Sequence, residues 1–295
     1  MNKCRLCPRN CGIDRTQTKG FCGEKTLRVS HVMLHHWEEP EISGNEQDCG
    51  SGTIFFTGCN LKCAYCQNWE ISNNGVGKNV SVEDLVEIFK VLEAAGALNI
   101  NLVTPTHFVD EILSSLKIYK PKVPVVWNTS GYESVETIEK LKGFVDVFLT
   151  DIKYFSPELS KKYSAAENYF KCASAAIVKM RDVVGEDIIV DGLMKKGIIV
   201  RHMVLPKCSS DSIKVLDWIK ETLGTTTILS IMNQYTPCFN AKMYPEINQK
   251  VPSIEYKRVV NYAITQGFTK VYAQEECSAN AEFIPEFKGF KPFGY

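Results

Sequence analysis

The sequence predicts an α/β fold, a partial (β/α) barrel of the TIM type preceded by a small cysteine-rich lobe. From residue 53, short apolar runs rich in β-branched residues alternate with amphipathic stretches at intervals of roughly 25–30 residues. Continuous apolar strands separated by helices are typical of a parallel sheet covered on both faces. Six or seven such units fit a full or partial barrel better than a flat doubly wound sheet. We therefore assign residues 1–50 to a metal-binding lobe and residues 51–295 to the barrel.

Each repeating unit is predicted to begin with a strand. The expected strands are TIFFTG (53–58), LNINLV (98–103), VPVVWN (123–128), DVFLTD (146–151), GIIVRHMVL (197–205), TTILSI (226–231) and TKVYA (269–273). Two of the stretches between them predict helices. SVEDLVEIFKVLEAAG (81–96) begins at a serine suited to cap a helix and repeats apolar residues at helical spacing, and SVETIEKLKGF (134–144) is similar.

The composition is that of an ordinary globular protein. The 295 residues include 34 basic and 34 acidic side chains, so no net charge favours nucleic acid or a membrane surface. No apolar run reaches the roughly 18 residues of a membrane-spanning helix, and the polar N-terminus lacks a signal-peptide core. We expect a cytoplasmic protein. Its 12 cysteines are then expected to stay reduced and, where clustered, to bind metal.

Polar residues gather where the predicted strands end, which is where (β/α) folds place their chemistry. Five of these polar stretches come at or after the end of a predicted strand, and one pair lies within a strand. The five are the cysteine loop, TPTH (104–107), NTSGY (128–132), DIKY (151–154) and MNQYTP (232–237), and the pair within a strand is Arg201 with His202. These six stretches are expected to converge on one mouth of the barrel.

The loop after the first strand, GCNLKCAYCQNWE (58–70), holds Cys59, Cys63 and Cys66 in a C-x3-C-x2-C spacing. Zinc sites usually pair their ligands as two C-x2-C knuckles or add histidine, and here no fourth ligand is present locally. A [4Fe–4S] cluster held by three cysteines leaves one iron open to chelate a cofactor. The spacing therefore favours such a cluster over zinc.

This motif, with the aromatic Tyr65 before its last cysteine, closely resembles that of the radical S-adenosylmethionine (SAM) superfamily. Further segments resemble its pyruvate formate-lyase activating-enzyme-like subgroup: WEEPEISG (37–44), GTIFFTGCNLKCAYCQNWEIS (52–72), NINLVTPTHFV (99–109), VVWNTSGYE (125–133) and DVFLTDIKY (146–154). The resemblance implies that SAM chelates the open iron and that the reduced cluster donates one electron. Cleavage of the S–C5′ bond then gives methionine and a 5′-deoxyadenosyl radical that abstracts hydrogen. The resemblance indicates this chemistry and not its target.

The resemblance also implies which residues contact SAM. The family's second strand ends in a Gly-Gly-Glu-type segment that binds the SAM amino group, and here Thr104-Pro105-Thr106-His107 stands in its place. The hydroxyl of Thr104 or Thr106 is expected to make that contact, with capping of a following helix as the alternative for Thr106. Tyr65 is expected to line the cofactor site.

Two further strand ends match the family. Asn128 and Ser130, with Thr129 between them, match the segment that contacts the ribose and carboxylate of SAM, and a polar turn is the alternative. Asp151 and Lys153 match an Asp-x-Lys pair and should share one strand face, as cofactor ligands or as a structural ion pair.

Arg201 and His202 point to opposite faces of their strand, so one of them faces the barrel. His202 resembles a SAM-contacting histidine of the family and is assigned to the cofactor, with a core histidine as the alternative. Gln234 and Tyr235 are expected to line the SAM or the substrate site.

A second group of cysteines lies near the N-terminus: Cys4, Cys7, Cys11 and Cys22. Four thiols in a lobe with few core residues predict a tetrahedral metal site with a mainly structural role. Zinc and an auxiliary iron–sulfur cluster fit this group equally, free thiols remain an alternative, and disulfides come last.

The other cysteines and the histidine-rich segment have plainer interpretations. Buried thiols or bystanders are expected at Cys49, Cys172, Cys208, Cys238 and Cys277, with Cys238 alone near the mouth. Packing at a sheet edge is expected for His31, His35, His36 and Trp37.

The leading hypothesis is a radical SAM oxidoreductase that receives its electron from a flavodoxin- or ferredoxin-type protein. Its target is either a glycyl radical enzyme, or a small molecule or other macromolecule. The replaced Gly-Gly-Glu-type segment and the N-terminal lobe weaken the analogy with known activating enzymes. A non-catalytic metal-sensing module is the alternative from another class, and it would not cleave SAM.

Overall fold

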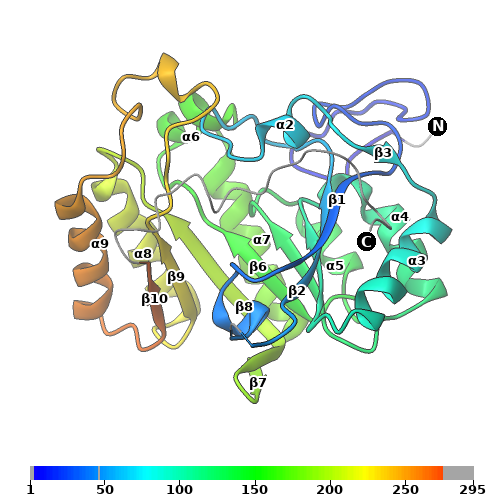
Figure 1. Ribbon diagram of the computed structural model, residues 1–295. Helices are drawn as coiled ribbons and strands as arrows, with labels where there is room; N and C mark the ends of the chain where they lie inside the picture. Colours follow the sequence, from blue (N-terminus) through cyan, green and yellow to red (C-terminus); the bar gives the residue numbers. More distant parts are fainter. Residues whose placement is uncertain (1–2, 46, 275–295) are drawn as a thin grey trace.

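The computed structural model describes residues 3–45 and 47–274. Its main feature is a sheet with the strand order β10-β9-β8-β6-β5-β4-β2-β1-β3, and β7 pairs with β8 off this path (Figure 1). Seven strands of it run parallel: β2 (Ser51–Phe56), β4 (Ile100–Val103), β5 (Val125–Thr129), β6 (Val147–Asp151), β8 (Leu193–Met203), β9 (Ile228–Met232) and β10 (Val271–Ala273). In the described part of the chain β10 and β3 are edges, so the barrel is partial and open.

The predicted fold class is confirmed, and each of the seven predicted strands has a counterpart in the sheet. The largest difference is at β8, which begins at Leu193 rather than at residue 197. Its extra residues pair antiparallel with β7 (Ile188–Val190). Asp191 and Gly192 connect the two strands with φ values of +52° and +79°, as a tight hairpin turn of this type requires.

Helices cover the convex face of the sheet. They are α3 (Val82–Ala94), α4 (Val109–Ile118), α5 (Val135–Lys140), α6 (Pro157–Ser164), α7 (Tyr169–Val184), α8 (Ser209–Leu223) and α9 (Ser253–Thr265). The predicted cap at Ser81 is present, because its hydroxyl accepts the Asp84 N–H while the Asp84 carboxylate accepts the Ser81 N–H. Among the described residues, no helix combines the length and apolar character that crossing a membrane requires.

The segment before the first parallel strand joins the sheet. β1 (Arg28–His35) pairs antiparallel with β2, and β3 (Lys78–Asn79) pairs with β1. Val29 is fully buried opposite Phe56. The boundary predicted at residue 50 therefore needs correction, because the cysteine-rich lobe ends at Leu27 and the sheet begins at the next residue.

A short helix fills the concave side of the sheet at the end away from the predicted mouth. In α1 (Pro40–Ser43), Ile42 is fully buried against Val126, Leu149 and Ile199, which point inward from β5, β6 and β8. The carbonyl of Ile42 also accepts a hydrogen bond of 2.6 Å from the Asn99 side chain. This packing draws the residues just before α1 into the barrel interior.

Candidate active site

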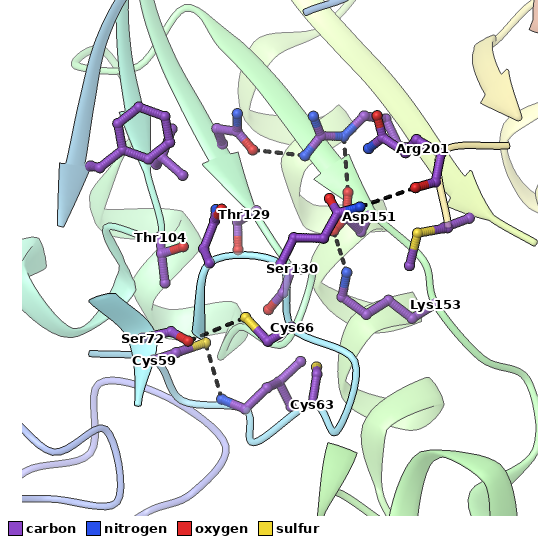
Figure 2. A pocket seen from close by; sticks show the side chains of 18 of the residues that line it. Cys59, Cys63, Cys66, Ser72, Thr104, Thr129, Ser130, Asp151, Lys153 and Arg201 are labelled. Carbon is purple, nitrogen blue, oxygen red and sulfur yellow. Dashed lines mark hydrogen bonds and ion pairs between the residues drawn. The ribbon is translucent and has the colours of Figure 1, made fainter. Parts of the chain in front are cut away.

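The carboxyl ends of the parallel strands surround a cavity of about 490 Å³. The three cysteines of the loop after β2 line it, together with six of the eight residues assigned to the cofactor: Tyr65, Thr104, Asn128, Ser130, Asp151 and Lys153. Gln234 and Tyr235 line it too. Figure 2 shows the cysteines on one side of the cavity and Arg201 with Asp151 across from them. The strand ends thus converge on one cavity, and contact of these residues with SAM stays a prediction.

Each cysteine sulfur of the loop has a hydrogen-bonding neighbour. The Leu61 N–H donates to Cys59 Sγ over 3.4 Å, and the Ser164 hydroxyl donates to Cys63 Sγ over 3.0 Å. The Ser72 hydroxyl, at the end of α2 (Trp69–Ser72), lies 3.2 Å from Cys66 Sγ. Donors to sulfur favour thiolate ligands of an anionic cluster.

Burial controls the charge of these thiols. It raises the pKa of Cys59 to about 11 and that of Cys66 to about 12, and the neighbouring Cys63 adds to both shifts. Burial also raises the pKa of Cys63, although Lys153 acts against it. The thiols therefore favour their protonated form at neutral pH, and binding of a metal would displace their protons.

Gly58 allows the loop to lie against the N-terminal lobe. Its φ of +76° is a left-handed conformation, and a Cβ there would lie 2.6 Å from the Cys22 carbonyl oxygen. The same carbonyl accepts the Cys59 N–H over 3.2 Å. A side chain at position 58 would separate the lobe from the loop.

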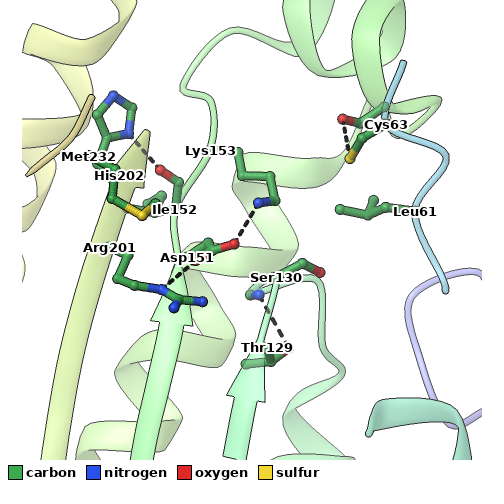
Figure 3. A network of polar contacts seen from close by, with 12 residues as sticks. Leu61, Cys63, Thr129, Ser130, Asp151, Ile152, Lys153, Arg201, His202 and Met232 are labelled. Carbon is green, nitrogen blue, oxygen red and sulfur yellow. Dashed lines mark hydrogen bonds and ion pairs between the residues drawn. The ribbon is translucent and has the colours of Figure 1, made fainter. Parts of the chain in front are cut away.

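A buried charge network faces the cysteines across the cavity (Figure 3). Arg201 donates to Asp151 over 2.9 Å and to Asn128 over 2.8 Å, and Lys153 forms an ion pair with the other Asp151 oxygen. The predicted placement of Asp151 and Lys153 on one face is therefore correct. Burial would raise the pKa of Asp151, but Lys153 and Arg201 outweigh it and hold that pKa below its ordinary value.

Two acidic residues from the WEEPEISG segment complete this network. The Glu38 carboxylate pairs with Arg201 over 3.0 Å and accepts a hydrogen bond from Asn128, also over 3.0 Å. Burial raises the pKa of Glu39, which Arg201 opposes from 3.9 Å. Sequence reasoning missed both residues, although two adjacent carboxylates just before the Pro40 that begins α1 were a signal.

His202 does not face this cavity, so its assignment to the cofactor needs correction. Its Nδ1 lies 2.7 Å from the Ile152 carbonyl oxygen and its Nε2 lies 2.8 Å from the Ser212 hydroxyl of α8. The residue is 1% exposed and lies on the convex face of the sheet. This placement fits the alternative of a core histidine. Arg201, its neighbour in β8, is the one that faces the barrel (Figure 3).

Thr106 also lies away from the cavity. It begins η1 (Thr106–Phe108), and its hydroxyl donates over 2.7 Å to Glu133 instead of capping a helix. Glu133 accepts two more hydrogen bonds on the same oxygen, from Thr129 and Trp127. Of the two threonines, only Thr104 reaches the cavity, with a φ of +58° that is rare for a β-branched residue and common at functional sites.

Tyr65 connects the cysteine loop to a cluster of buried tyrosines. Its hydroxyl bonds with that of Tyr154, which lies 2.7 Å from the Ser164 hydroxyl, and Ser164 in turn donates to Cys63. Tyr169 donates to the Ser130 carbonyl over 2.7 Å and packs in the same cluster. The tyrosines thus support the loop and the end of β5 from behind.

The remaining cysteines and histidines are spread over the fold. All described cysteines are free; Cys208 is buried, Cys49 is exposed, and Cys277 lies outside the described residues. Cys238 does not line the cavity, and its sulfur bonds to the Tyr65 carbonyl over 3.4 Å. His35 lines the cavity at the end of β1 rather than only packing at an edge.

Comparison with known proteins identifies the family. The sequence model of the radical SAM superfamily matches residues 53–197. The protein MJ0674 of Methanocaldococcus jannaschii, described as uncharacterized, is 32% identical over 281 residues, which cover 91% of this chain and 76% of MJ0674. The chain belongs to the radical SAM superfamily. A second protein of that organism, MJ0808, is also described as uncharacterized and is 22% identical. The match covers 92% of this radical SAM chain and 80% of MJ0808.

Solved structures share the fold of this radical SAM protein. Streptococcus suis SuiB bound to the precursor peptide SuiA superposes with a TM-score of 0.51 at 15% identity, covering 80% of this chain. The chain spans only about half the length of SuiB, 51%. A spore photoproduct lyase mutant superposes with a TM-score of 0.51 at 14% identity, covering 82% of this chain and 80% of that one.

Membership implies a [4Fe–4S] cluster and SAM, and the residues present fit both. Among the described residues that line the cavity, the cysteines are Cys59, Cys63 and Cys66, which leaves one iron of a cubane for the cofactor. As a radical SAM enzyme, the protein uses these two groups to generate a 5′-deoxyadenosyl radical. Membership in this enzyme superfamily overturns the alternative of a non-catalytic metal-sensing module.

Proposed function

We propose that this enzyme abstracts a hydrogen atom from an uncharged peptide segment of a protein, and that a glycyl radical enzyme is its first candidate substrate. The observation that carries the proposal is a group of neutral carboxamides around the cavity: Gln67, Asn68, Gln234 and Gln274. A carboxamide both donates and accepts hydrogen bonds, as a peptide backbone does. A glycine-containing loop would offer that backbone without a side chain.

Three of the four carboxamides, Gln67, Gln234 and Gln274, lie beside one another. The Gln67 side chain donates to the main-chain carbonyl of Gln234 over 3.0 Å, and the Gln274 side chain donates to the side-chain oxygen of Gln234 over 3.4 Å. All four are partly exposed, so they can exchange these bonds for bonds to a partner. The acidic and basic side chains of the lining are instead engaged with one another, as in the Asp151–Arg201 pair, which disfavours a phosphorylated or highly charged substrate.

The residues of the chain bind SAM and place its reacting carbon in this scheme. Lys153 and Ser130 would hold the SAM carboxylate, and Thr104, which has a φ of +58°, would hold its amino group. Asp151 keeps Lys153 charged and fixed. A substrate segment bound in the open mouth of the cavity would exclude water from the reacting carbon. Bound SAM would supply the 5′-deoxyadenosyl radical, and transfer of one hydrogen atom from the glycine Cα to it would give 5′-deoxyadenosine and a glycyl radical.

The electron for SAM cleavage comes from outside the chain in this proposal. A low-potential one-electron donor of the flavodoxin or ferredoxin class supplies it, one electron for each SAM cleaved. The pyruvate formate-lyase activating-enzyme-like resemblance of the cysteine loop supports this choice of target and donor.

The test combines the reconstituted enzyme, SAM and a reductant with a purified glycyl radical enzyme of the same organism, under anaerobic conditions. We expect a glycyl radical signal in electron paramagnetic resonance and about one 5′-deoxyadenosine per radical formed. A partner whose radical glycine is replaced by alanine is the matched control. Formation of 5′-deoxyadenosine that responds to a small metabolite, with no protein radical on any partner, would overturn the proposal.

A second variant separates substrate binding from SAM binding. Gln234→Ala combined with Gln274→Ala should weaken the partner-dependent rate by at least about tenfold, because two hydrogen bonds to the substrate are lost. SAM affinity should stay within a factor of about two. An equal loss of both would assign these carboxamides to SAM instead of the substrate.

A further inference from the structure

Three buried hydroxyl groups form a line that ends at one sulfur of the catalytic loop, the cysteine loop after β2. The Ser164 hydroxyl donates to Cys63 Sγ over 3.0 Å. Behind it, the Tyr154 hydroxyl lies 2.7 Å from the Ser164 oxygen and also bonds to the hydroxyl of Tyr65. The exposed fraction is 0% for Ser164, 1% for Tyr154 and 4% for Tyr65, so each hydroxyl finds its partner within the line rather than in water.

The position of each proton follows from the direction of the first hydrogen bond. A hydroxyl has one proton to donate and two lone pairs with which to accept. Because Ser164 gives its proton to the sulfur, its oxygen can only accept from Tyr154. Tyr154 has then used its own proton and accepts from Tyr65. All three O–H dipoles therefore point their positive ends toward Cys63, and each polarises the next.

Main-chain groups hold this line at a fixed distance from the loop. Ser164 is the last residue of α6, and the Ala64 N–H of the loop donates to the Tyr163 carbonyl over 2.7 Å. Arg9 of the N-terminal lobe joins the same two segments. It donates to the Asn60 carbonyl over 2.7 Å and to the Ser164 carbonyl over 3.4 Å. The end of α6 therefore lies firmly against the loop, with its serine hydroxyl on the sulfur.

The other two sulfurs of the loop have longer hydrogen bonds. The Leu61 N–H lies 3.4 Å from Cys59 Sγ, and the Ser72 hydroxyl lies 3.2 Å from Cys66 Sγ. Both the shortest of the three bonds and the line of hydroxyls belong to Cys63. The structure therefore directs its strongest hydrogen-bond donor to one particular ligand of the cluster.

We propose that Tyr65, Tyr154 and Ser164 form a polarised relay that raises the reduction potential of the catalytic [4Fe–4S] cluster. The reduced cluster carries one more negative charge than the oxidised cluster, so a donor to a ligand sulfur stabilises the reduced state more. The two tyrosines strengthen that donor by making the serine proton more positive. All three are positioning residues, because they act through Cys63. The relay affects reduction of the cluster, which comes before any reaction with a substrate, and is independent of the proposed function.

The test measures the reduction potential of the anaerobically reconstituted protein. The signal followed is the electron paramagnetic resonance of the reduced cluster that SAM perturbs in a separate sample, which excludes any metal bound in the lobe. Ser164→Ala should lower the ratio of reduced to oxidised cluster at a fixed potential about tenfold, a one-electron shift of about 59 mV to more negative values. Tyr154→Phe keeps the serine and removes only the donor behind it, so it should shift the potential in the same direction by less.

A double variant tests the order of the relay. In Ser164→Ala the tyrosines have lost their connection to the sulfur. Adding Tyr154→Phe to Ser164→Ala should therefore shift the potential no further, whereas independent effects of the two residues would add. An additive shift would show that Tyr154 acts on the cluster by another route and would overturn the relay.

The matched control removes a hydroxyl beside the relay. Tyr163→Phe, one residue before Ser164, loses a hydrogen bond of 2.6 Å to Glu246 and leaves the three relay hydroxyls in place. Its potential should equal that of the unmodified protein. Iron content and melting temperature establish that each variant is folded and holds its cluster.

Three other results would contradict the relay. An unchanged potential in Ser164→Ala would mean that its hydroxyl does not act on the cluster. A shift in Ser164→Ala with none in Tyr154→Phe would mean that the serine acts alone. Equal shifts in Tyr154→Phe and Tyr163→Phe would assign the change to packing around α6. If Ser164→Ala does not retain its cluster, Tyr154→Phe and its control still decide, and none of these readings requires a substrate.

Discussion

The two cysteine groups of this chain are neighbours in space, yet different forces position them. The catalytic loop leaves β2, every residue of which is buried, and Ser72 and Ser164 bond to its sulfurs. The lobe is different, because among described residues 3–27 the buried hydrophobic side chains are those of Cys22 and Leu27. The packing of the barrel therefore positions its cysteines, whereas we expect the lobe to depend on a bound metal in order to fold.

The largest expected effect follows from the catalytic loop. Cys63→Ala should abolish 5′-deoxyadenosine formation, because a cubane held by two thiolates is not retained. The melting temperature of the metal-free chain should change little, since the barrel positions the loop. Cys49→Ala, at an exposed thiol that does not line the cavity, is the matched control. Activity in Cys63→Ala that equals the control would contradict the cluster assignment.

The lobe should respond in the opposite way. A Cys4→Ser/Cys7→Ser variant should lose the lobe's metal, and residues 3–27 should become open to limited proteolysis while the barrel resists it. The reason is that few apolar side chains hold the lobe once the metal is gone. Mass spectrometry of the fragments reads the result. Equal resistance in the variant and the unmodified chain would show that the lobe folds without metal.

The difference between barrel and lobe also explains what the sequence could predict. The seven strands and the cap at Ser81 follow from apolar runs and local spacing, and the structure contains them all. The three-cysteine loop was identifiable because its spacing alone carries the chemistry. Sheet-edge packing was expected for His31 and His35, but the pairing of β1 with β2 was missed, since these histidines interrupt the apolar pattern of a strand.

Contacts between distant segments were beyond the sequence. Arg201 and Glu38 lie 163 residues apart along the chain, and they meet only because α1 packs inside the barrel. The inward face of β8 was likewise undetermined, because a one-residue shift in register exchanges Arg201 and His202. Thr106 was misassigned for the same reason: its partner, Glu133, follows a different strand.

Substitutions on the two faces of β8 should therefore differ in their effects on stability and SAM affinity. Arg201→Ala removes the cationic partner of the buried Glu38 carboxylate and leaves Asp151 with Lys153 alone, so it should cost about 3–5 kcal/mol of stability and lower SAM affinity more than tenfold. His202→Ala loses hydrogen bonds only on the convex face and should cost about 1–3 kcal/mol. Its SAM affinity should stay within about twofold. Urea unfolding and SAM titration with the cluster intact measure both, and equal SAM defects would contradict this register.

The last expected effect depends on pH and concerns Glu133, which lies between the two regions. It bonds to Thr129 of the catalytic cavity lining and lies near Cys7 of the lobe. Burial raises its pKa from 4.5 to about 7, and its three hydroxyl and indole donors offset only part of that rise. The folded chain therefore holds this proton to higher pH than the unfolded chain, so its contribution to stability is complete below pH 4.5 and is lost as the pH rises through about 7. The loss amounts to at most about 3 kcal/mol.

Glu133→Gln keeps the accepting oxygen and cannot ionise, which makes it the matched variant. Measured by urea unfolding, the stability of the unmodified chain relative to Glu133→Gln should fall as the pH rises from 4.5 to above 7. A difference that does not change with pH would mean that Glu133 keeps an ordinary pKa. If Glu133 stays buried, the stability difference should change with pH to the full extent. If the loss of metal from the lobe exposes Glu133 to water, the difference should change less with pH. Repeating the measurement in the Cys4→Ser/Cys7→Ser background therefore reports whether the order of this part of the barrel depends on the lobe.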